Sequence, residues 1–162
     1  MLVVKSILVV LVLVALVAVG AGQAGLLRGR DPAELGVRDG RLRPPSSTPN
    51  SVSSQAALYP ENPQRAYADI APLKLQGTGP QTIARLRRII EEMPGAEIVK
   101  SAPDYLQVRF TTRVMKFVDD AEFWSDPSVQ AIQVRSASRL GSKDFGTNRR
   151  RIEEIRQALA AR

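Results

Sequence analysis

The side chains that could do chemistry in this 162-residue chain are mostly carboxylates and guanidinium groups in its C-terminal half. Asp119, Asp120 and Glu122 lie close together, and such residues act as general acids and bases or bind divalent cations. Arginines follow them along the chain and could pair with these acids or bind an external anion. The candidate site residues are Asp119, Asp120, Glu122, Arg135, Ser136, Ser138, Arg139, Asp144, Asn148, Arg149 and Arg151. We assign none of them a catalytic or metal-binding role, and expect a cluster that binds an anion or forms internal ion pairs.

Catalysis has little support in the composition. The chain has no histidine and no cysteine, so it lacks the usual general base near neutral pH, the commonest metal ligand and any thiol nucleophile. Ser136 and Ser138 have no histidine to activate them, and we expect their hydroxyls to bond to neighbouring backbone. Asp119 and Asp120 are adjacent in a predicted strand and therefore point to opposite faces of it. We expect a non-enzymatic protein with no cofactor, and the alternative is a carboxylate-dependent hydrolase.

The run Arg149 to Arg151 falls in the first turn of a predicted helix, where a cation is destabilising by about 0.3–1 kcal/mol. One hypothesis is a salt-bridge network in which Asp119, Asp120 and Glu122 tie the start of this helix to the sheet. A second is that some of the arginines, together with free N–H groups at the helix start, bind a phosphate or a carboxylate. The third is a solvated surface.

Two helices should frame the elements that carry these residues. The first begins at the capping-box sequence Thr78-Gly-Pro-Gln81 and ends at Pro94-Gly95. Its apolar stripe consists of Ile83, Leu86, Ile90 and Met93. The last helix has a stripe of Ile152, Ile155 and Leu159, and Asp144 or Thr147 should cap it.

Four strands are predicted between the helices, at 96–100, 105–111, 116–124 and 131–139. The third is interrupted by Asp119 and Asp120. Because the connections are too short to hold crossover helices, the sheet should be antiparallel. The predicted fold class is α+β, with a roughly four-stranded antiparallel sheet flanked by two helices.

The N-terminal run from Ile7 to Gly22 contains no polar side chain. Continued to Leu27, it reaches the roughly twenty residues that a bilayer-spanning helix needs, and Arg28 and Arg30 follow it. We expect residues 1–27 to be an uncleaved single-pass anchor with the rest of the chain outside the cytoplasm. The alternative is a signal peptide cleaved near Ala21, which would give a secreted or periplasmic protein.

Residues 28–75 hold most of the prolines and show no sustained helical or strand period. Pro44, Pro45 and Pro49 exclude helix around them. We interpret 28–75 as an extended Pro/Ser-rich linker or arm, which is either a tether or an ordered segment that wraps the domain. Residues 76–162 then form the α+β domain.

The charge balance favours anionic partners. Lys and Arg total 23 against 16 Asp and Glu, which gives a net charge of +7. The membrane itself is the first expected partner, through the N-terminal helix, and an anionic lipid or an envelope protein is the second. Nucleic acid is disfavoured, because Glu91 and Glu92 lie in the same predicted helix as the basic stretch Arg85 to Arg88 and because the N-terminus is expected to direct export.

Several short motifs together resemble one family. They are Leu35 to Gly40, Pro44 to Ser54, Phe117 to Phe123, Val134 to Gly141 and Asp144 to Glu153. Over roughly Leu35 to Leu159 the chain resembles the uncharacterised family called domain of unknown function 1499. The resemblance implies a small exported or anchored bacterial protein with organellar relatives, and it carries over no activity. The family often has a cysteine pair in its Pro-rich motif, and the matching positions here hold Pro45 and Ser51.

Overall fold

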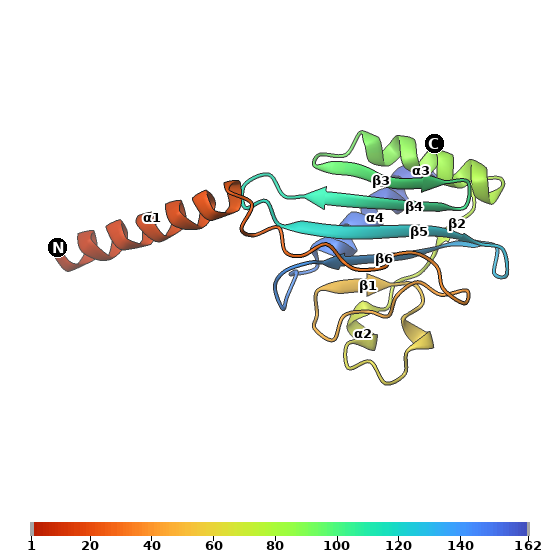
Figure 1. The fold of residues 1–162 in the computed structure, drawn as a ribbon, viewed down its shortest axis with the longest axis horizontal. Coiled ribbons are helices and arrows are strands. Elements are labelled where there is room, and N and C mark those ends of the chain that lie inside the picture. The colour runs from red at the N-terminus through yellow and green to blue at the C-terminus, as the bar shows by residue number, and fades with distance from the viewer. Residues whose placement is uncertain (1, 162) are drawn as a thin grey trace.

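The apolar N-terminal run forms helix α1 (Leu2–Gln23), which projects from one end of the protein (Figure 1). The computed structural model describes residues 2–161. Apolar side chains are exposed along α1, and Val17, for example, is 72% exposed. The segment Val3–Gln23 is long and apolar enough to cross a membrane. A signal sequence has the same properties, so α1 fits both the expected anchor and the cleaved alternative.

An antiparallel sheet of six strands forms the body of the domain. Four strands follow one another along the chain: β3 (Ala96–Ala102), β4 (Tyr105–Thr111), β5 (Val118–Asp126) and β6 (Ala131–Ser138). Two shorter strands, β1 (Ser51–Ser53) and β2 (Leu73–Lys74), both pair with β6. The strand order is therefore β1-β6-β5-β4-β3, with β2 also beside β6.

The expectation of roughly four strands is wrong, because it omits β1 and β2. Strands of three and two residues are too short to show an alternating pattern. They exist because β6 offers them a free edge, on which Val52 lies opposite Ser136 and Leu73 lies opposite Ile132. Short helix α2 (Arg65–Ala68) and a 3₁₀ turn (Ala56–Leu58) were likewise not predicted.

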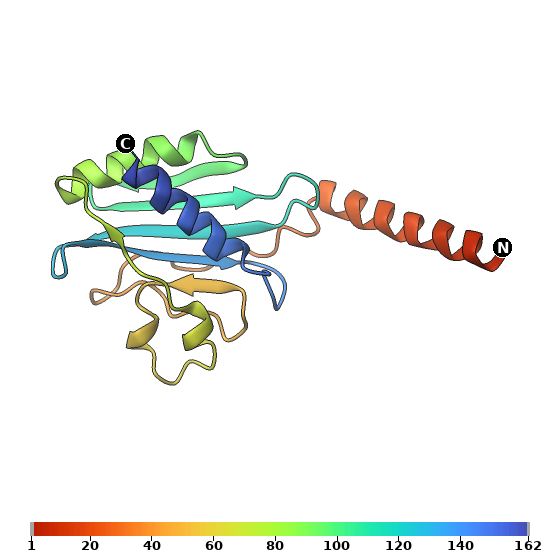
Figure 2. The same ribbon diagram turned by 180° about the vertical axis from the view of Figure 1, so that it is seen from behind.

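Two helices, α3 (Gly79–Glu91) and α4 (Thr147–Ala160), pack on one face of the sheet (Figure 2). The predicted capping box of α3 is confirmed: Thr78 Oγ1 accepts from the Gln81 N–H, and Gln81 Oε1 accepts from the Thr78 N–H. Gly146, in the left-handed region, occupies the cap position of α4. The Asp144 carboxylate accepts the Asn148 N–H, so Asp144 satisfies the helix start from two residues further out.

The main core lies between these helices and the sheet. Its largest fully buried members are Leu73, Ile83, Leu86, Ile90, Leu106, Phe123, Ile132, Ile152 and Ile155. These residues include most of the predicted apolar stripes of α3 and α4 and the inward-facing positions of β4 and β6. Burial of such side chains contributes about 1.5–3 kcal/mol each relative to exposure.

A segment that we call the covering segment, residues 28–46, crosses the opposite face of the sheet (Figure 1). The Gly36 N–H donates to Glu122, and the Pro44 carbonyl accepts from Arg135. Leu42 packs with Tyr105 and Trp124 as a second, smaller core. Because β5 is covered on both faces, all of its residues except Ser125 are buried.

The prediction that Asp119 and Asp120 interrupt the third strand is wrong. β5 runs through both residues without a break, and each of the two pairs with residues of both neighbouring strands. Each aspartate also has an arginine partner, Arg151 for Asp119 and Arg139 for Asp120. These ion pairs make buried carboxylates tolerable in a strand.

Candidate functional site

The alternation of β5 and β6 divides the candidate residues between the two faces of the sheet. Asp119, Ser136 and Ser138 face the helices and meet residues of α4. Asp120, Glu122, Arg135 and Arg139 face the covering segment. The sheet therefore separates the candidate residues into two clusters, and they do not form one site.

Asn148 organises the cluster on the helix face and is fully buried. Its Nδ2 lies within hydrogen-bond distance of the Asn50 carbonyl, Ser138 Oγ and Asp144 Oδ2, at 3.1, 3.0 and 2.9 Å, so its two N–H groups are shared among three acceptors. Its Oδ1 accepts from Ser136 Oγ at 2.5 Å. Because its amide is fully satisfied by protein groups, this cluster is built to hold β6, the start of α4 and the segment before β1 together.

The arginines at the start of α4 also have protein partners. Arg151 contacts Asp119 at 2.6 Å and lies over the Phe110 ring, 4.4 Å from its centroid. Arg149 donates to the carbonyls of Tyr67 and Asp69. These contacts offset the unfavourable position of cations at a helix N-terminus. Arg150 is exposed and donates to the Phe145 carbonyl and to Thr147.

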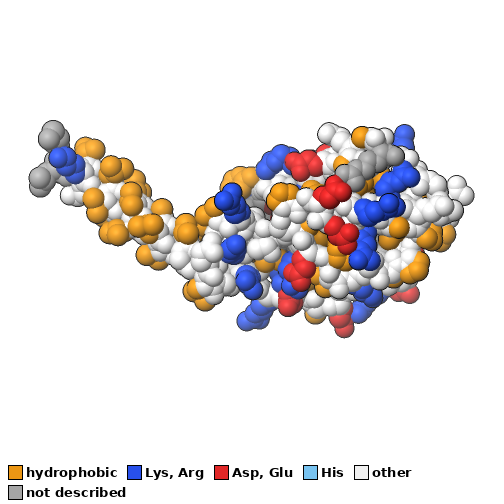
Figure 3. Space-filling model, turned by 90° about the horizontal axis from the view of Figure 1, so that it is seen from above, with side chains coloured by type: hydrophobic (Ala, Val, Ile, Leu, Met, Phe, Trp, Pro, Cys, Tyr) orange, Lys and Arg blue, Asp and Glu red, His pale blue; other side chains and the backbone are white. Residues whose placement is uncertain are grey.

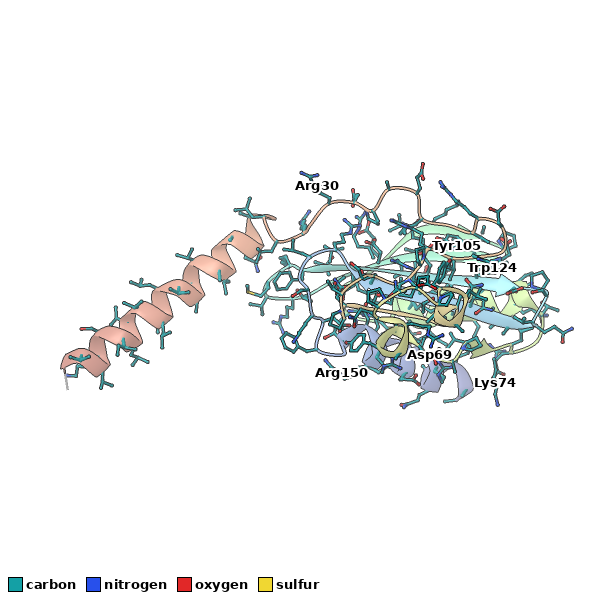
Figure 4. All side chains as sticks on the ribbon, turned by 90° about the horizontal axis from the view of Figure 1, so that it is seen from below. Arg30, Asp69, Lys74, Tyr105, Trp124 and Arg150 are labelled. Atoms are coloured by element: carbon teal, nitrogen blue, oxygen red, sulfur yellow. The ribbon has the colours of Figure 1, made fainter. Side chains whose placement is uncertain are left out.

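Glu122 is the centre of the cluster on the covered face and is fully buried. Its Oε1 accepts from Tyr105 Oη and from the Gly36 N–H, both at 2.8 Å. Within residues 2–161 its Oε2 has no hydrogen-bond partner, and it lies 3.7 Å from a terminal nitrogen of Arg135. Burial lowers the pKa of Arg135 even though Glu122 opposes that effect. Burial, together with the Glu122 charge, raises the pKa of Tyr105. Tyr105 and Trp124 lie together on this face, close to the covering segment (Figure 4).

Arg139 connects this cluster to the covering segment. It donates twice to Asp120, at 2.6 and 2.8 Å, and also forms an ion pair with Asp31. The hydrogen bonds with Asp120 raise the pKa of Arg139. Asp31 was not among the candidate residues, because no local pattern singles out one aspartate in a segment without periodicity.

A groove of about 620 Å³ opens at the end of the domain that adjoins α1. We call it the basic groove. Its apolar lining comes from Met93, Pro94 and Phe110. Its charged lining consists of the cations Arg113, Lys116, Arg150 and Arg151 and the single acid Glu154.

The basic groove lies next to the C-terminal end of α1. Arg113 and Lys116 belong to the β4–β5 loop, and Gln23 at the end of α1 donates to the Val114 carbonyl in that same loop. In the space-filling view, Lys and Arg side chains gather where α1 meets the domain (Figure 3). Arg30 and Arg150 lie on opposite sides of the sheet, both toward this end, whereas Lys74 lies far from it (Figure 4). Of the residues that line the groove, only Arg151 was among the candidate site residues. The lining is assembled from the turn after α3, the end of β4, the β4–β5 loop and the first turns of α4, which lie far apart in sequence.

A family model described as Protein of unknown function (DUF1499) matches residues 41–159, which is most of the chain. The chain belongs to the DUF1499 family. The resemblance seen in the sequence is thereby confirmed. No curated protein and no solved structure matches the chain.

The region that matches DUF1499 runs from just before β1 almost to the end of α4, and it contains the Asn148 cluster and the whole lining of the basic groove. Helix α1 and residues 28–40, including Asp31 and Gly36, lie outside the match. The DUF1499 domain of this protein thus takes part of its covered face from a segment that precedes the match.

The three acidic candidates on β5 of this DUF1499 protein all have partners within the protein. Asp119 and Asp120 form close ion pairs, and Glu122 is fully buried beneath Gly36. Among residues 2–161, no group of three or more metal-ligating side chains is arranged to hold a metal ion. These three acidic candidates therefore make contacts within the protein, and the basic groove is a separate candidate site.

Proposed function

We propose that the protein is a single-pass membrane protein whose domain lies against the outer surface of the bilayer and binds the head group of an anionic phospholipid in the basic groove. The function is non-enzymatic. The observation that carries the proposal is the combination of an apolar lining with four cations in one groove, beside the end of an apolar helix of spanning length. A phospholipid has the matching chemistry, since a negative phosphate adjoins apolar chains.

The groove offers cations to the phosphate of a phospholipid and an apolar side chain to the part next to it. The exposed Arg113 and Arg150 offer guanidinium groups to a phosphate, and Arg pairs with phosphate through short charge-assisted hydrogen bonds. Met93 is half-buried and offers apolar surface to the glycerol and upper acyl region. Each cation near an anionic bilayer surface contributes about 1 kcal/mol of attraction.

Two exposed apolar residues belong to loops that adjoin the groove. Val114 in the β4–β5 loop is 53% exposed, and Phe145 in the loop before α4 is 83% exposed. Lys143 and Arg150 flank Phe145 in sequence and are exposed. Apolar tips between cations are typical of surfaces that rest in the head-group region of a bilayer.

Lipid retention by the full-length protein tests the proposal. The protein is reconstituted in nanodiscs of phosphatidylcholine mixed with phosphatidylglycerol, released into the gas phase and examined by native mass spectrometry for bound lipid. We expect phosphatidylglycerol adducts in excess of its share of the bilayer. The variant Arg113→Gln/Arg150→Gln should weaken this enrichment about fivefold for each arginine, which is the factor for about 1 kcal/mol.

A second groove supplies the matched control. It is lined by Gln76, Gly77, Gln81, Ala84, Arg85 and Arg88, so it carries cations without the large apolar side chains. The variant Arg85→Gln/Arg88→Gln removes the same charge and should leave lipid enrichment unchanged. Equal loss in both double variants would overturn the proposal, and so would equal retention of phosphatidylcholine.

A further inference from the structure

Asp31 is an exposed carboxylate that satisfies a buried cation. Its side chain is 77% exposed, whereas the side chain of its closest partner, Arg139, is only 7% exposed. A second arginine, Arg109, reaches the same carboxylate oxygen at 3.7 Å. Asp31 is thus the solvent-facing member of a three-residue arrangement in which Arg109 belongs to β4 and Arg139 directly follows β6.

Asp31 lines two hollows in the surface. One, of about 280 Å³, is lined by Arg28, Arg109 and Arg139, and the other, of about 300 Å³, by Arg30, Arg43 and Arg135 together with Arg139. Asp31 and Arg139 line both. Only Glu97 and Asp120 add further acidic groups to the two linings. Arginines therefore outnumber acidic residues around Asp31. The excess of positive charge increases if the Asp31 carboxylate moves away.

Arg139 and Arg109 both have N–H groups that can donate to a ligand at the position of the Asp31 carboxylate. Arg139 uses two of its nitrogens on Asp120, which fixes the plane of its guanidinium and leaves the nitrogen that contacts Asp31 facing the hollows. Arg109 Nε is buried and has no hydrogen-bond partner in the part of the chain that is described. A fixed guanidinium beside a donor without a partner is suited to an oxyanion.

Asp31 reaches Arg139 because the backbone at Gly29 passes very close to Arg139. Gly29 has φ +68°, and a Cβ atom there would lie 2.7 Å from the Cβ atom of Arg139. A side chain at position 29 would push the covering segment away from Arg139. The contact of Asp31 is therefore specific, although an ion pair with such an exposed member contributes little to stability and is readily exchanged.

We propose that Arg139 and Arg109 form a binding site for an oxyanion, a phosphate or a carboxylate, and that Asp31 occupies this site when the ligand is absent. The ligand displaces the Asp31 carboxylate and takes over its contacts with both arginines. The site lies on the covered face of the sheet and does not depend on the lipid site proposed for the basic groove. Because Asp31 follows α1 closely in sequence, its displacement releases the start of the covering segment beside the anchor.

Titration of the full-length protein in detergent micelles with inorganic phosphate, followed by ³¹P NMR at constant ionic strength, tests this proposal. Asp31→Asn should bind phosphate about two- to fivefold more tightly than the unaltered protein, which is the range expected for loss of an exposed competing carboxylate. Glu34→Gln is the matched control, since it removes an exposed acid of the same segment that pairs only with Arg38 among the ion pairs of the described chain. It should leave phosphate affinity unchanged.

The arginine requirement is tested in the Asp31→Asn background. Adding Arg109→Gln should abolish saturable phosphate binding, and the side chain of Arg109 is 30% exposed, so the fold tolerates this change. Arg139→Gln is not used, because it leaves Asp120 buried without its partner. The proposal is overturned if Asp31→Asn binds phosphate no better than Glu34→Gln, or if binding survives Arg109→Gln.

Two bilayers distinguish the source of the ligand. In phosphatidylcholine nanodiscs, Asp31→Asn should bind free phosphate as it does in micelles. If phosphatidylglycerol nanodiscs suppress that binding, the natural ligand is a lipid head group. If binding is the same in both, the ligand is a soluble oxyanion.

Discussion

The side-chain amide of Asn148 donates a hydrogen bond of 3.1 Å to the backbone carbonyl of Asn50, which lies 98 residues earlier in the chain. Asn50 in turn accepts the Ser138 N–H through the same carbonyl, so the group joins the segment before β1, the end of β6 and the start of α4. A buried polar group of this kind stabilises only when all of its partners are present.

Asn148→Ala should therefore destabilise the protein strongly. The substitution removes a partner of Ser136 Oγ and of the Asn50 carbonyl in a buried place, at a cost of about 2–4 kcal/mol in the free energy of unfolding. Urea unfolding of the full-length protein in micelles, followed by the fluorescence of its single tryptophan, Trp124, measures the loss. The exposed Gln157→Ala on the same helix should change the value by less than about 0.5 kcal/mol. A free energy for Asn148→Ala equal to that of Gln157→Ala would refute the structural role.

Asp144 should make stability depend on acid pH. Burial raises the pKa of Asp144, but hydrogen bonds from Tyr67, Asn148 and Gly146 outweigh burial and hold the pKa below its ordinary value. Because the folded-state pKa is the lower one, the stabilisation is complete above the unfolded-state pKa of about 3.9 and is lost as pH falls through the folded-state pKa.

The difference in unfolding free energy between the unaltered protein and Asp144→Asn should thus be largest near neutral pH and shrink below about pH 4. Urea unfolding at a series of pH values measures this difference. Asp39→Asn, at an exposed position, is the control and should change the free energy of unfolding by less than about 0.5 kcal/mol at neutral pH. A constant difference for Asp144→Asn across the acid range would contradict the prediction.

Glu122 and Tyr105 should differ in how much their removal costs. Glu122→Gln leaves the Arg135 guanidinium buried without its counter-charge, and breaking a buried pair in this way costs about 3–5 kcal/mol. Tyr105→Phe removes one donor to the Glu122 carboxylate and leaves the Gly36 N–H in place, which costs about 1.5–3 kcal/mol. Chemical unfolding of the two variants in parallel gives the order, and a larger loss for Tyr105→Phe would show that Arg135 does not depend on Glu122.

Gly22→Val should loosen the junction between α1 and the domain. A Cβ atom at Gly22 would lie 2.5 Å from the Met115 carbonyl oxygen, so the β4–β5 loop has to move. Since the chain has no cysteine, spin labels can be placed at two introduced cysteines, Ala18→Cys and Lys143→Cys. We expect Gly22→Val to broaden the distance distribution between the labels.

Gly20→Val is the control for that measurement, because a Cβ atom at Gly20 would meet no atom of residues 2–161 within 4 Å apart from its chain neighbours and the backbone of its own helix. It should leave the distribution unchanged. Identical distributions for both variants would mean that the contact at Gly22 does not set the orientation of α1.

Local patterns predicted the parts of the fold that local interactions decide. The Thr78–Gln81 capping box is made by residues three apart, and the alternation of Leu106, Val108 and Phe110 reports burial on one side of β4. The prediction that Asp119 and Asp120 break the strand failed because distant residues decide the outcome. Two adjacent carboxylates suggest the end of a strand, but Arg139 and Arg151, which are far away in sequence, pair with them and make both acceptable in the interior.

The candidate residues were recognised as polar groups that need partners, but not as two clusters. Their separation follows from the register of β5 and β6, which places Glu122 opposite Arg135 and Asp119 opposite Ser138. Asp31 and Gly36 reach the cluster around Glu122 and Arg139 only because the covering segment crosses the sheet. No sequence pattern in residues 28–46 predicts that path. The basic groove is lined by the turn after α3, the end of β4, the β4–β5 loop and the first turns of α4, which come together only in the folded protein.

The hydrogen bond from Gly36 to Glu122 limits how far the domain can move from the end of α1. Between the end of α1 at Gln23 and this fixed point, residues 24–35 can span at most roughly 40 Å even when fully extended. With α1 in a bilayer, the domain cannot sample the aqueous space beyond this radius. Any soluble partner has to come to the lipid surface to meet it, and a receptor seated in the same membrane needs only to diffuse in two dimensions.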